Sequence, residues 1–286
     1  MKIGIVGNGY VGNATALLQD FEGVECIAYD IEPARCNPRG VELKDLSDCE
    51  LIFICVPTPM LVDGSCSIHS VESAVEDLKK ASIDLNKVVV RSTVPVGTCK
   101  KLGVSFMPEF LTEANWREDF KKNKDWIIGI DSKDDKDSPE LWDKRAVFTK
   151  LATAAYKNMH YMTTKEAECV KLVRNSFLAI KVSFFNEIEE FCRGRSIDFE
   201  TVRLGVTQDK RIGRSHSKVP GPDGMRGFGG TCFPKDLHSL FHQIHEMHHK
   251  DSEMDTPSLI SAALSRNENV DRKNRDWENN KGRSVV

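Results

Sequence analysis

The feature that most constrains the fold lies at the N-terminus, where a short apolar run leads directly into a glycine-rich turn. The run KIGIV is followed by GNGYVG, which supplies Gly7, Gly9 and Gly12, and then by a stretch with helical spacing over 10–21. A second apolar run, VECIAYD, ends at Asp30, 18 residues after Gly12. A strand, a turn of this kind, a helix and a second strand that ends in a carboxylate are the pattern of a dinucleotide-binding fold.

The spacing also predicts how this turn would bind its ligand. Glycines let the main chain approach a pyrophosphate at the start of the helix, and Asp30 is placed to accept hydrogen bonds from ribose hydroxyls. Because a carboxylate there would repel a 2′-phosphate, the sequence favours NAD over NADP. The alternative is a tight strand–helix turn that binds no ligand.

Two further apolar runs, ELIFICV and KVVVRST, are rich in Val and Ile and alternate with helix-like stretches. Strands that alternate with helices predict an α/β fold built on a Rossmann-like, doubly wound parallel sheet. We expect this NAD-binding domain to span residues 1–160. Near its end, the polar run DSKDDKDSPE lacks the glycine and the spacing of a calcium loop, which indicates a solvated loop.

The sequence changes character after residue 160. From Thr164 to Cys192 it contains neither Gly nor Pro, and its apolar residues recur at helical spacing around much of the circumference. This predicts a long helix that ends near Gly194 and is buried on several sides, partly against a second copy of the chain. We expect a further helical stretch, a glycine-rich loop and a helix from about Pro234, so that residues 161–286 form the central helix and a helical catalytic and dimerisation domain.

Composition limits the possible functions. The 286 residues are 40% hydrophobic and 29% charged, and a net charge of −3 gives no general attraction to nucleic acid or to an anionic membrane. No apolar run approaches the roughly 20 residues of a membrane span, and the N-terminus lacks the apolar core of a signal peptide. The nine cysteines are an odd number without a CxxC pair, so we expect no metal site, no disulfide framework and a cytoplasmic location.

The run GFGGTCFPKD, residues 227–236, places Cys232 directly before a predicted helix. A helix N-terminus favours thiolate over thiol and lowers the thiol pKa from about 8.5, and Lys235 adds a nearby cation. The glycines let the main chain come close to a bound ligand, and Asp236 lies one turn beyond Cys232. An activated thiolate is a candidate covalent nucleophile, and the alternative is a small buried residue.

Two pairs of polar residues recur with a spacing of four. Lys171 and Asn175 share a face of the long predicted helix, where a cation and an amide can polarise an oxygen. Glu109 and Glu113, in MPEFLTE, repeat the spacing. Either pair alone is more typical of a helix surface than of a reaction centre. Their occurrence together with Cys232 and a dinucleotide fold favours a reaction centre.

Four histidines, His238, His242, His245 and His249, fall on one face of the last predicted helix. A metal site is conceivable, but a solvated face is favoured because no carboxylate or cysteine completes the set at a fitting spacing.

These motifs together resemble the UDP-glucose/GDP-mannose dehydrogenase family, most closely its UDP-glucose 6-dehydrogenases. The shared stretches follow the family's order over residues 1 to about 240: GNGYVG, CVPTP, STVPVGT, MPEFLTE, ECVKLVRNSF, KRIG and GPDGMRGFGGTCFPKD. Thr231 replaces the serine that is usual before the cysteine. The chain is shorter than typical members, so the resemblance implies a short form without the C-terminal nucleotide-binding domain.

The resemblance implies an NAD-dependent, four-electron oxidation of a nucleotide-sugar C6 alcohol to the carboxylate. Cys232 would form a thiohemiacetal and then a thioester, and UDP-glucose giving UDP-glucuronate is the favoured reaction. The same residues would serve GDP-mannose, and less readily a UDP-N-acetylhexosamine. A non-catalytic protein that binds NAD or a nucleotide-sugar is the alternative from another class, but it would need no nucleophile.

Roles for single residues follow from the same resemblance. Lys171 and Asn175 would stabilise the oxyanion, Asp236 would tune Lys171 and the attacking water, Thr93 would order that water, and Glu109 would be the base. NAD contacts are implied for Gly7, Gly9, Val11, Gly12, Asp30, Arg35, Thr58, Thr93, Glu113 and Lys235. Substrate contacts are implied for Glu109, Phe110, Leu111, Lys171, Asn175, Gly221, Pro222, Asp223, Gly224, Met225, Gly229 and, from the partner of a homodimer, Arg211.

Overall fold

The computed structural model describes four stretches of the chain: residues 1–112, 115–131, 139–250 and 258–286. The side chains of residues 248–250 are not described. Most of the polar run predicted to be a solvated loop, residues 132–138, lies outside them.

The chain divides into two compact units. The first comprises Met1–Thr58 and Ile68–Lys171, and the second comprises Pro59–Ser67 and Leu172–Val286. The division therefore falls at Lys171, inside the long helix, whereas the sequence places the domain boundary at residue 160. That domain boundary stays a prediction.

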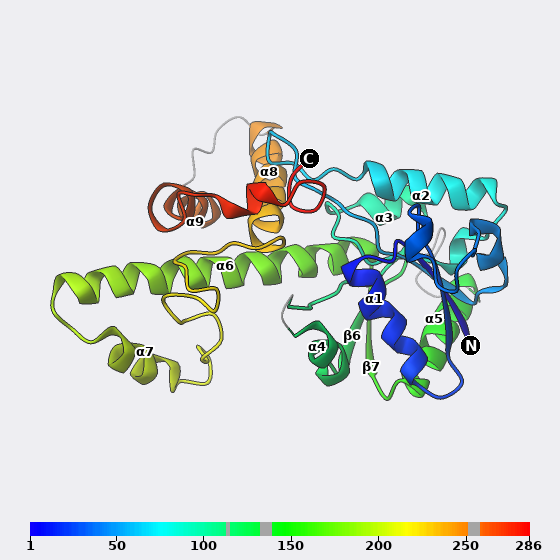
Figure 1. Cartoon of the computed structure of the whole chain (residues 1–286), viewed down its shortest axis with the longest axis horizontal. Helices are drawn as coiled ribbons and strands as arrows, with labels where there is room; N and C mark the ends of the chain where they lie inside the picture. The colour runs from blue at the N-terminus through cyan, green and yellow to red at the C-terminus, as the bar shows by residue number, and fades with distance from the viewer. Residues whose placement is uncertain (113–114, 132–138, 251–257) are drawn as a thin grey trace. The chain divides into compact units, whose positions relative to one another are not determined.

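The first unit is built on a sheet of seven strands in the order β2-β1-β3-β4-β5-β6-β7 (Figure 1). The strands are Lys2–Val6 (β1), Glu25–Tyr29 (β2), Leu51–Ile54 (β3), Val88–Val90 (β4), Ser105–Phe106 (β5), Asp125–Gly129 (β6) and Asn158–Met162 (β7). The four runs predicted as strands form β1 to β4, and the predicted α/β, doubly wound fold is confirmed. A wholly parallel sheet is wrong at one pair, because β5 and β6 are antiparallel.

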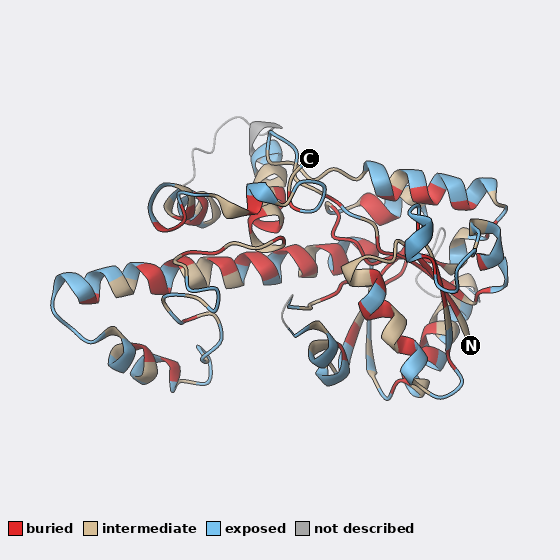
Figure 2. Ribbon diagram, viewed as in Figure 1, coloured by how far each residue is buried: buried red, intermediate tan, exposed pale blue. Residues whose placement is uncertain are grey.

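Helices cover both faces of this sheet. They are Tyr10–Ala16 (α1), His69–Lys80 (α2), Thr98–Leu102 (α3), Trp116–Lys122 (α4) and Pro139–Ala154 (α5). Along β3, Leu51 and Phe53 enter one core cluster, which includes residues of α5, and Ile52 and Ile54 enter another, which includes residues of α2. Successive strand residues thus face opposite cores, and Figure 2 shows buried residues along the strands.

The predicted long helix is α6, Thr164–Gly194, with 31 residues, and it ends at the glycine expected to stop it. The second unit adds Phe199–Thr207 (α7), Phe233–Lys250 (α8) and Leu259–Arg266 (α9), followed by a π turn, Asn267–Asp271. Its core joins α6, α8 and α9 through Ala179, Phe228, Leu237, Ala263 and Leu264. No helix in the described part of the chain is long and apolar enough to cross a membrane.

Candidate active site

The glycine-rich turn begins where β1 ends and leads straight into α1. Gly7 has φ +89°, and a side chain there would lie 2.9 Å from the main-chain oxygen of Cys55. At Gly12 a side chain would overlap the main-chain oxygen of Gly7, while a side chain at Gly9 would meet open space. The turn therefore requires glycine at positions 7 and 12. The lack of a side chain at Gly9 leaves space for a pyrophosphate to approach the main chain.

Asp30 is buried directly after β2. Its carboxylate accepts hydrogen bonds from the main-chain N–H of Asn8 at 2.7 Å and of Glu32 at 2.9 Å. The side chain of Asn8 donates to the main-chain oxygen of Arg35 at 2.7 Å, while the exposed guanidinium of Arg35 pairs with Glu32. Asn8 thus joins the glycine turn to the segment after β2, a role that the sequence analysis missed although Asn8 lies inside the fingerprint.

The carboxyl ends of β1 to β4 lie at one edge of the sheet because these strands are parallel. The chain passes from β1 outward to β2 and returns to β3 on the other side of β1, which makes this edge the topological switch point. Thr58 and Thr93, both buried, follow β3 and β4 at this edge, and the half-buried Val11 lies in α1. Glu113, also predicted to contact NAD, lies outside the described residues.

Lys171 and Glu109 form a buried ion pair in the first unit. The ammonium of Lys171 donates to Oε1 and to the main-chain oxygen of Glu109, both at 2.7 Å, and the side chains are 3% and 7% exposed. Glu109 also accepts from the N–H of Leu111 at 2.8 Å. Burial raises the pKa of Glu109, but Lys171, the N–H of Leu111 and Arg91 together lower it by more, so the pKa lies below its ordinary value.

Residues 107–112 belong to neither a helix nor a strand, so Glu109 does not lie on a helix face, and its predicted pairing with Glu113 falls outside the described residues. The ammonium of Lys171 also lies 5.5 Å from the ring centre of Phe110.

Two charged residues of the first unit, Arg91 and Glu168, were missed by the sequence analysis. Arg91 is buried over the ring of Phe53 and donates to the sulfur of Met107 at 3.3 Å. The carboxylate of Glu168, three residues before Lys171, accepts the N–H groups of Gly97 at 2.5 Å and Cys99 at 2.7 Å. Burial raises the pKa of Glu168, and these bonds fasten the start of α6 to the start of α3.

In the second unit Cys232 lies immediately before α8, as predicted. The N–H of Asp236 donates to the main-chain oxygen of Cys232 at 3.0 Å, which closes the first turn. The buried carboxylate of Asp236 accepts from the amide of Asn175 at 2.6 Å and from the ammonium of Lys235 at 2.5 Å. Burial lowers the pKa of Lys235, but Asp236, Cys66 and Cys232 together raise it by more, so the pKa lies above its ordinary value and Lys235 stays charged.

Asp236 is therefore the common partner of Asn175 and Lys235. Its suggested role in tuning Lys171 stays a prediction. Lys171 and Asn175 lie on successive turns of the continuous helix α6, as their spacing indicates.

The predicted substrate loop is a tight turn followed by a glycine-rich stretch. The N–H of Gly221 donates to the main-chain oxygen of Met225 at 2.7 Å, across Pro222 and Gly224, and Asp223 pairs with Arg272 at 2.6 Å. Further along, a side chain at Gly229 would overlap the guanidinium of Arg272. Arg272 was missed because the charged C-terminal stretch looks like a solvated surface. Arg211 is 90% exposed and pairs with Asp209 at 2.5 Å.

The histidines of α8 have separate partners. His238 lies 2.8 Å from Glu268 and His242 3.5 Å from Glu246, while His245 stacks on a phenylalanine ring. The side chain of His249 is not among those that the structure describes. Among the residues that the structure describes, no three His, Cys, Asp or Glu side chains are grouped as a metal site would require.

A switch-point edge with this glycine turn, followed by a long helix and a helical unit that bears a thiol, defines a dinucleotide-binding dehydrogenase fold. The chain belongs to the UDP-glucose/GDP-mannose dehydrogenase family: residues 41–150 match the NAD binding domain of that family, and residues 165–269 match its central domain. NAD, predicted from the fingerprint, is thereby confirmed as the cofactor of the domain.

Individual relatives agree with this assignment. The chain is 31% identical to a UDP-glucose 6-dehydrogenase of Rickettsia bellii, over 84% of this chain and 62% of the relative, and 32% identical to one of Pseudomonas aeruginosa, over 84% and 60%. It therefore spans about three fifths of the length of these relatives.

Solved structures show the same fold. A UDP-glucose dehydrogenase from Pyrobaculum islandicum matches with a TM-score of 0.76 at 26% identity, over 93% of this chain and 67% of that one. A 3-hydroxyisobutyrate dehydrogenase from Mycobacterium tuberculosis matches with a TM-score of 0.68 at 14% identity, over 92% of this chain and 91% of that one. The fold therefore extends beyond the family.

Proposed function

We propose that the protein oxidises the C6 alcohol of a nucleotide-sugar to the carboxylate with NAD, and that UDP-glucose is converted into UDP-glucuronate. The observation that carries this proposal is the first turn of α8, where Cys232 is followed by a buried carboxylate held by an amide and an ammonium. A module that only binds a nucleotide-sugar has no use for a thiol in this setting. The names of the relatives support the choice of substrate.

The residues at the sheet edge fit NAD. Gly7 and Gly12 permit the tight turn, a side chain at Gly9 would meet open space where a pyrophosphate would approach, and Asp30 is a carboxylate placed for ribose hydroxyls. When bound there, NAD accepts a hydride from the sugar carbon. Asp30 already holds two main-chain N–H groups, which fixes its orientation before the ligand arrives.

The thiol would act after the first oxidation. The thiolate of Cys232 attacks the C6 aldehyde, a carbon–sulfur bond forms, and the carbonyl electron pair moves to the oxygen, which takes a proton. Loss of a hydride from this thiohemiacetal to a second NAD, together with loss of the hydroxyl proton to water, gives a thioester. Water then attacks the thioester carbon and the thiolate leaves, so that the carboxylate is released and Cys232 is regenerated.

Lys171 and Asn175 would donate to the oxyanion in these steps, because both project from successive turns of α6. Glu109 would take the proton from water. Its lowered pKa keeps it ionised at neutral pH, as a base must be, and the bond to Lys171 holds it in place.

The test is NADH formation, followed by absorbance, with UDP-glucose, GDP-mannose and UDP-N-acetylglucosamine in parallel. We expect activity with UDP-glucose and two NADH per sugar oxidised, because both hydrides leave the same carbon. One NADH per sugar, with free aldehyde released, would contradict the thioester route. If no sugar yields NADH while NAD still binds, the protein is a binding protein.

We also propose a homodimer formed through α6. Phe177, Phe184 and Phe191 recur every seven residues along this helix and are 64%, 53% and 56% exposed. A stripe of exposed aromatic rings at this spacing is typical of a helix seam against another helix. In such a dimer, the exposed Arg211 would be available to the partner's substrate.

Arg211→Ala is expected to weaken nucleotide-sugar binding at least tenfold, about the worth of one charge-assisted hydrogen bond, and to leave NAD binding unchanged. Mixing this variant with Cys232→Ser should restore about a quarter of wild-type activity. In a random mixture half of the dimers are mixed, and each mixed dimer has one pocket with both residues intact. Activity and subunit exchange are measured on the same sample. Confirmed exchange without recovered activity would rule out a shared site.

A further inference from the structure

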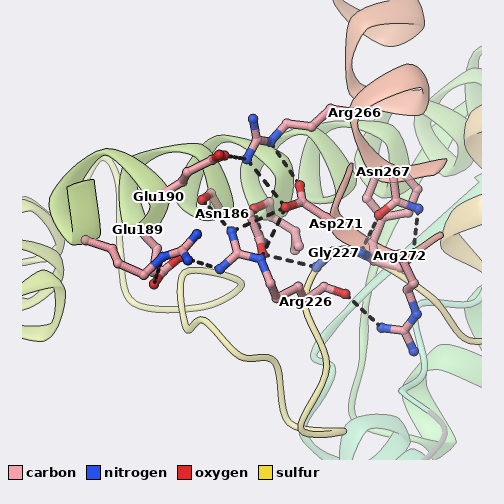
Figure 3. Close-up of polar contacts among 12 residues, drawn as sticks. Asn186, Glu189, Glu190, Arg226, Gly227, Arg266, Asn267, Asp271 and Arg272 are labelled. Atoms are coloured by element: carbon pink, nitrogen blue, oxygen red, sulfur yellow. Dashed lines mark hydrogen bonds and ion pairs between the residues drawn. The ribbon is translucent and has the colours of Figure 1, made fainter. Parts of the chain in front are cut away.

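The loop that leads to Cys232 is held by hydrogen bonds to buried side-chain amides that the proposed reaction does not use (Figure 3). Asn267, at the start of the π turn, accepts the N–H of Phe228 at 2.8 Å and donates its own amide to the main-chain oxygen of Phe228 at 2.9 Å. Asn186, on α6, accepts the N–H of Gly227 at 3.1 Å. Both asparagines are buried, with exposures of 0% and 1%.

Each amide is itself fixed in orientation. Asn186 donates to the main-chain oxygen of Val182 at 2.8 Å, so that its oxygen faces the loop. Asn267 satisfies a donor and an acceptor of the same residue, as a neighbouring strand would do for a buried peptide. The stretch from Gly227 to Phe228 is buried without belonging to a helix or strand, and the amides supply the bonds that secondary structure would otherwise provide.

Glycines mark where the loop lies closest to these side chains. Gly227 has φ +68°, and a side chain there would overlap the amide oxygen of Asn267. At Gly229 a side chain would overlap the guanidinium of Arg272. The glycines that the sequence crowds before Cys232 thus serve a close approach between the loop and the segment 267–276.

Ion pairs also hold the earlier part of the loop. Arg272 is 3% exposed in its side chain and binds Asp223 at 2.6 Å and Asp276 at 2.5 Å. Arg226 pairs with Glu189 and, at 3.3 Å, with Asp271 (Figure 3). The segment 267–276 therefore contacts the loop near both ends.

We infer that Asn186, Asn267 and Arg272 are positioning residues: they fix the main chain of loop 221–231 and thereby the approach of Cys232 to its substrate. That the loop lies along a nucleotide-sugar rests on the proposed function. None of the three residues takes part in the proposed chemistry, so their effect passes through Gly227, Phe228 and Gly229. The ring of Phe228 is buried in the core of the second unit, and the hydrogen bonds between Asn267 and the main chain of Phe228 hold it there.

Asn267→Asp is the test, since it keeps the size and the acceptor but places an oxygen against the main-chain oxygen of Phe228. Asn269→Asp is the matched control, because Asn269 is exposed and lies two residues away. For Asn267→Asp we expect amide hydrogen exchange in peptide 221–231 to speed up at least about tenfold, and kcat to fall by about tenfold or more. The Kd for NAD should stay within about twofold, because NAD is held by the first unit. The control should match the wild type in all three.

The outcomes separate the two proposals. Unchanged exchange in the loop would overturn the positioning role, and so would faster exchange with unchanged kcat, which is what a merely structural bond predicts. If the wild type forms no NADH, the proposed function fails, yet the exchange comparison between the two aspartate variants still decides whether Asn267 holds the loop.

A second variant keeps the inference testable if Asn267→Asp does not fold. Gly229→Ala presses a methyl group against Arg272, and we expect the same loss of kcat. Gly205→Ala is its control, because a side chain at Gly205 meets open space. A Gly229→Ala enzyme with wild-type kcat would refute the role assigned to Arg272.

Discussion

Cys232→Ser is expected to abolish turnover and to leave NAD binding intact. The thiol lies at the start of α8 and is the proposed nucleophile, whereas a serine hydroxyl stays protonated at neutral pH and is a far weaker nucleophile. Removal of a covalent nucleophile costs about 10⁴-fold to 10⁶-fold in kcat. The neighbouring Asp236, Asn175 and Lys235 keep their mutual bonds in the variant, because the side chain of Cys232 supplies none of them.

The loss is measured as NADH formation with UDP-glucose, and NAD binding as a fluorescence titration. Cys169→Ser is the matched control, since Cys169 is another half-buried cysteine and has no part in the proposed chemistry. It should retain wild-type activity. A Cys232→Ser enzyme with activity close to the wild type would remove Cys232 from the mechanism.

Much of the fold could be predicted from the sequence, because the deciding signals are local. The glycine turn requires strand before it and helix after it, and runs of Val and Ile mark β1 to β4 as strands buried on both faces. The direction of β6 could not be predicted. Its partner β5 has two residues and pairs through Phe106 and Gly129 alone, so direction is set by tertiary packing and not by a pattern in either segment.

The candidate site shows the same division between local and distant information. The shared face of Lys171 and Asn175 follows from helix geometry. Their partners do not, because Glu109 is 62 residues from Lys171, and Asp236 is 61 from Asn175, and no spacing rule spans such distances. Asn267 was missed for a further reason: a buried amide that binds main chain looks, in sequence, like any surface asparagine.

Lys171→Met is expected to destabilise the first unit by about 3–5 kcal/mol, because it leaves the carboxylate of Glu109 buried without its cation. Lys171→Met/Glu109→Gln should recover most of this loss, since no buried charge remains. Unfolding in urea is followed by tryptophan fluorescence, to which the first unit contributes Trp116, Trp126 and Trp142. Lys122→Met is the control: Lys122 and Glu118 are 3.5 Å apart but 76% and 63% exposed, so the cost should stay below about 1 kcal/mol.

The dependence on pH has a definite sign. In the wild type the pKa of Glu109 is lowered, so its contribution to stability is full above the unfolded pKa of about 4.3 and is lost as the pH falls through the folded pKa. Without Lys171, the largest opposition to burial is gone and only the N–H of Leu111 and Arg91 still lower the pKa of Glu109, so this pKa is expected to be higher in the variant than in the wild type. As the pH falls from 7 towards 4, Glu109 is then protonated in the variant before it is protonated in the wild type. Protonation removes the buried unpaired charge, so the loss of unfolding free energy caused by Lys171→Met should shrink.

Stability and catalysis can be separated with the same double variant. Lys171→Met/Glu109→Gln should be nearly as stable as the wild type and yet lose about 10²-fold or more in kcat, because both the oxyanion donor and the base are gone. A double variant that recovers activity together with stability would show that the pair only supports the fold. A single variant as stable as Lys122→Met at every pH would show that the pair does not act as a buried ion pair. Only the combination of restored stability and lost turnover assigns Lys171 and Glu109 to the reaction.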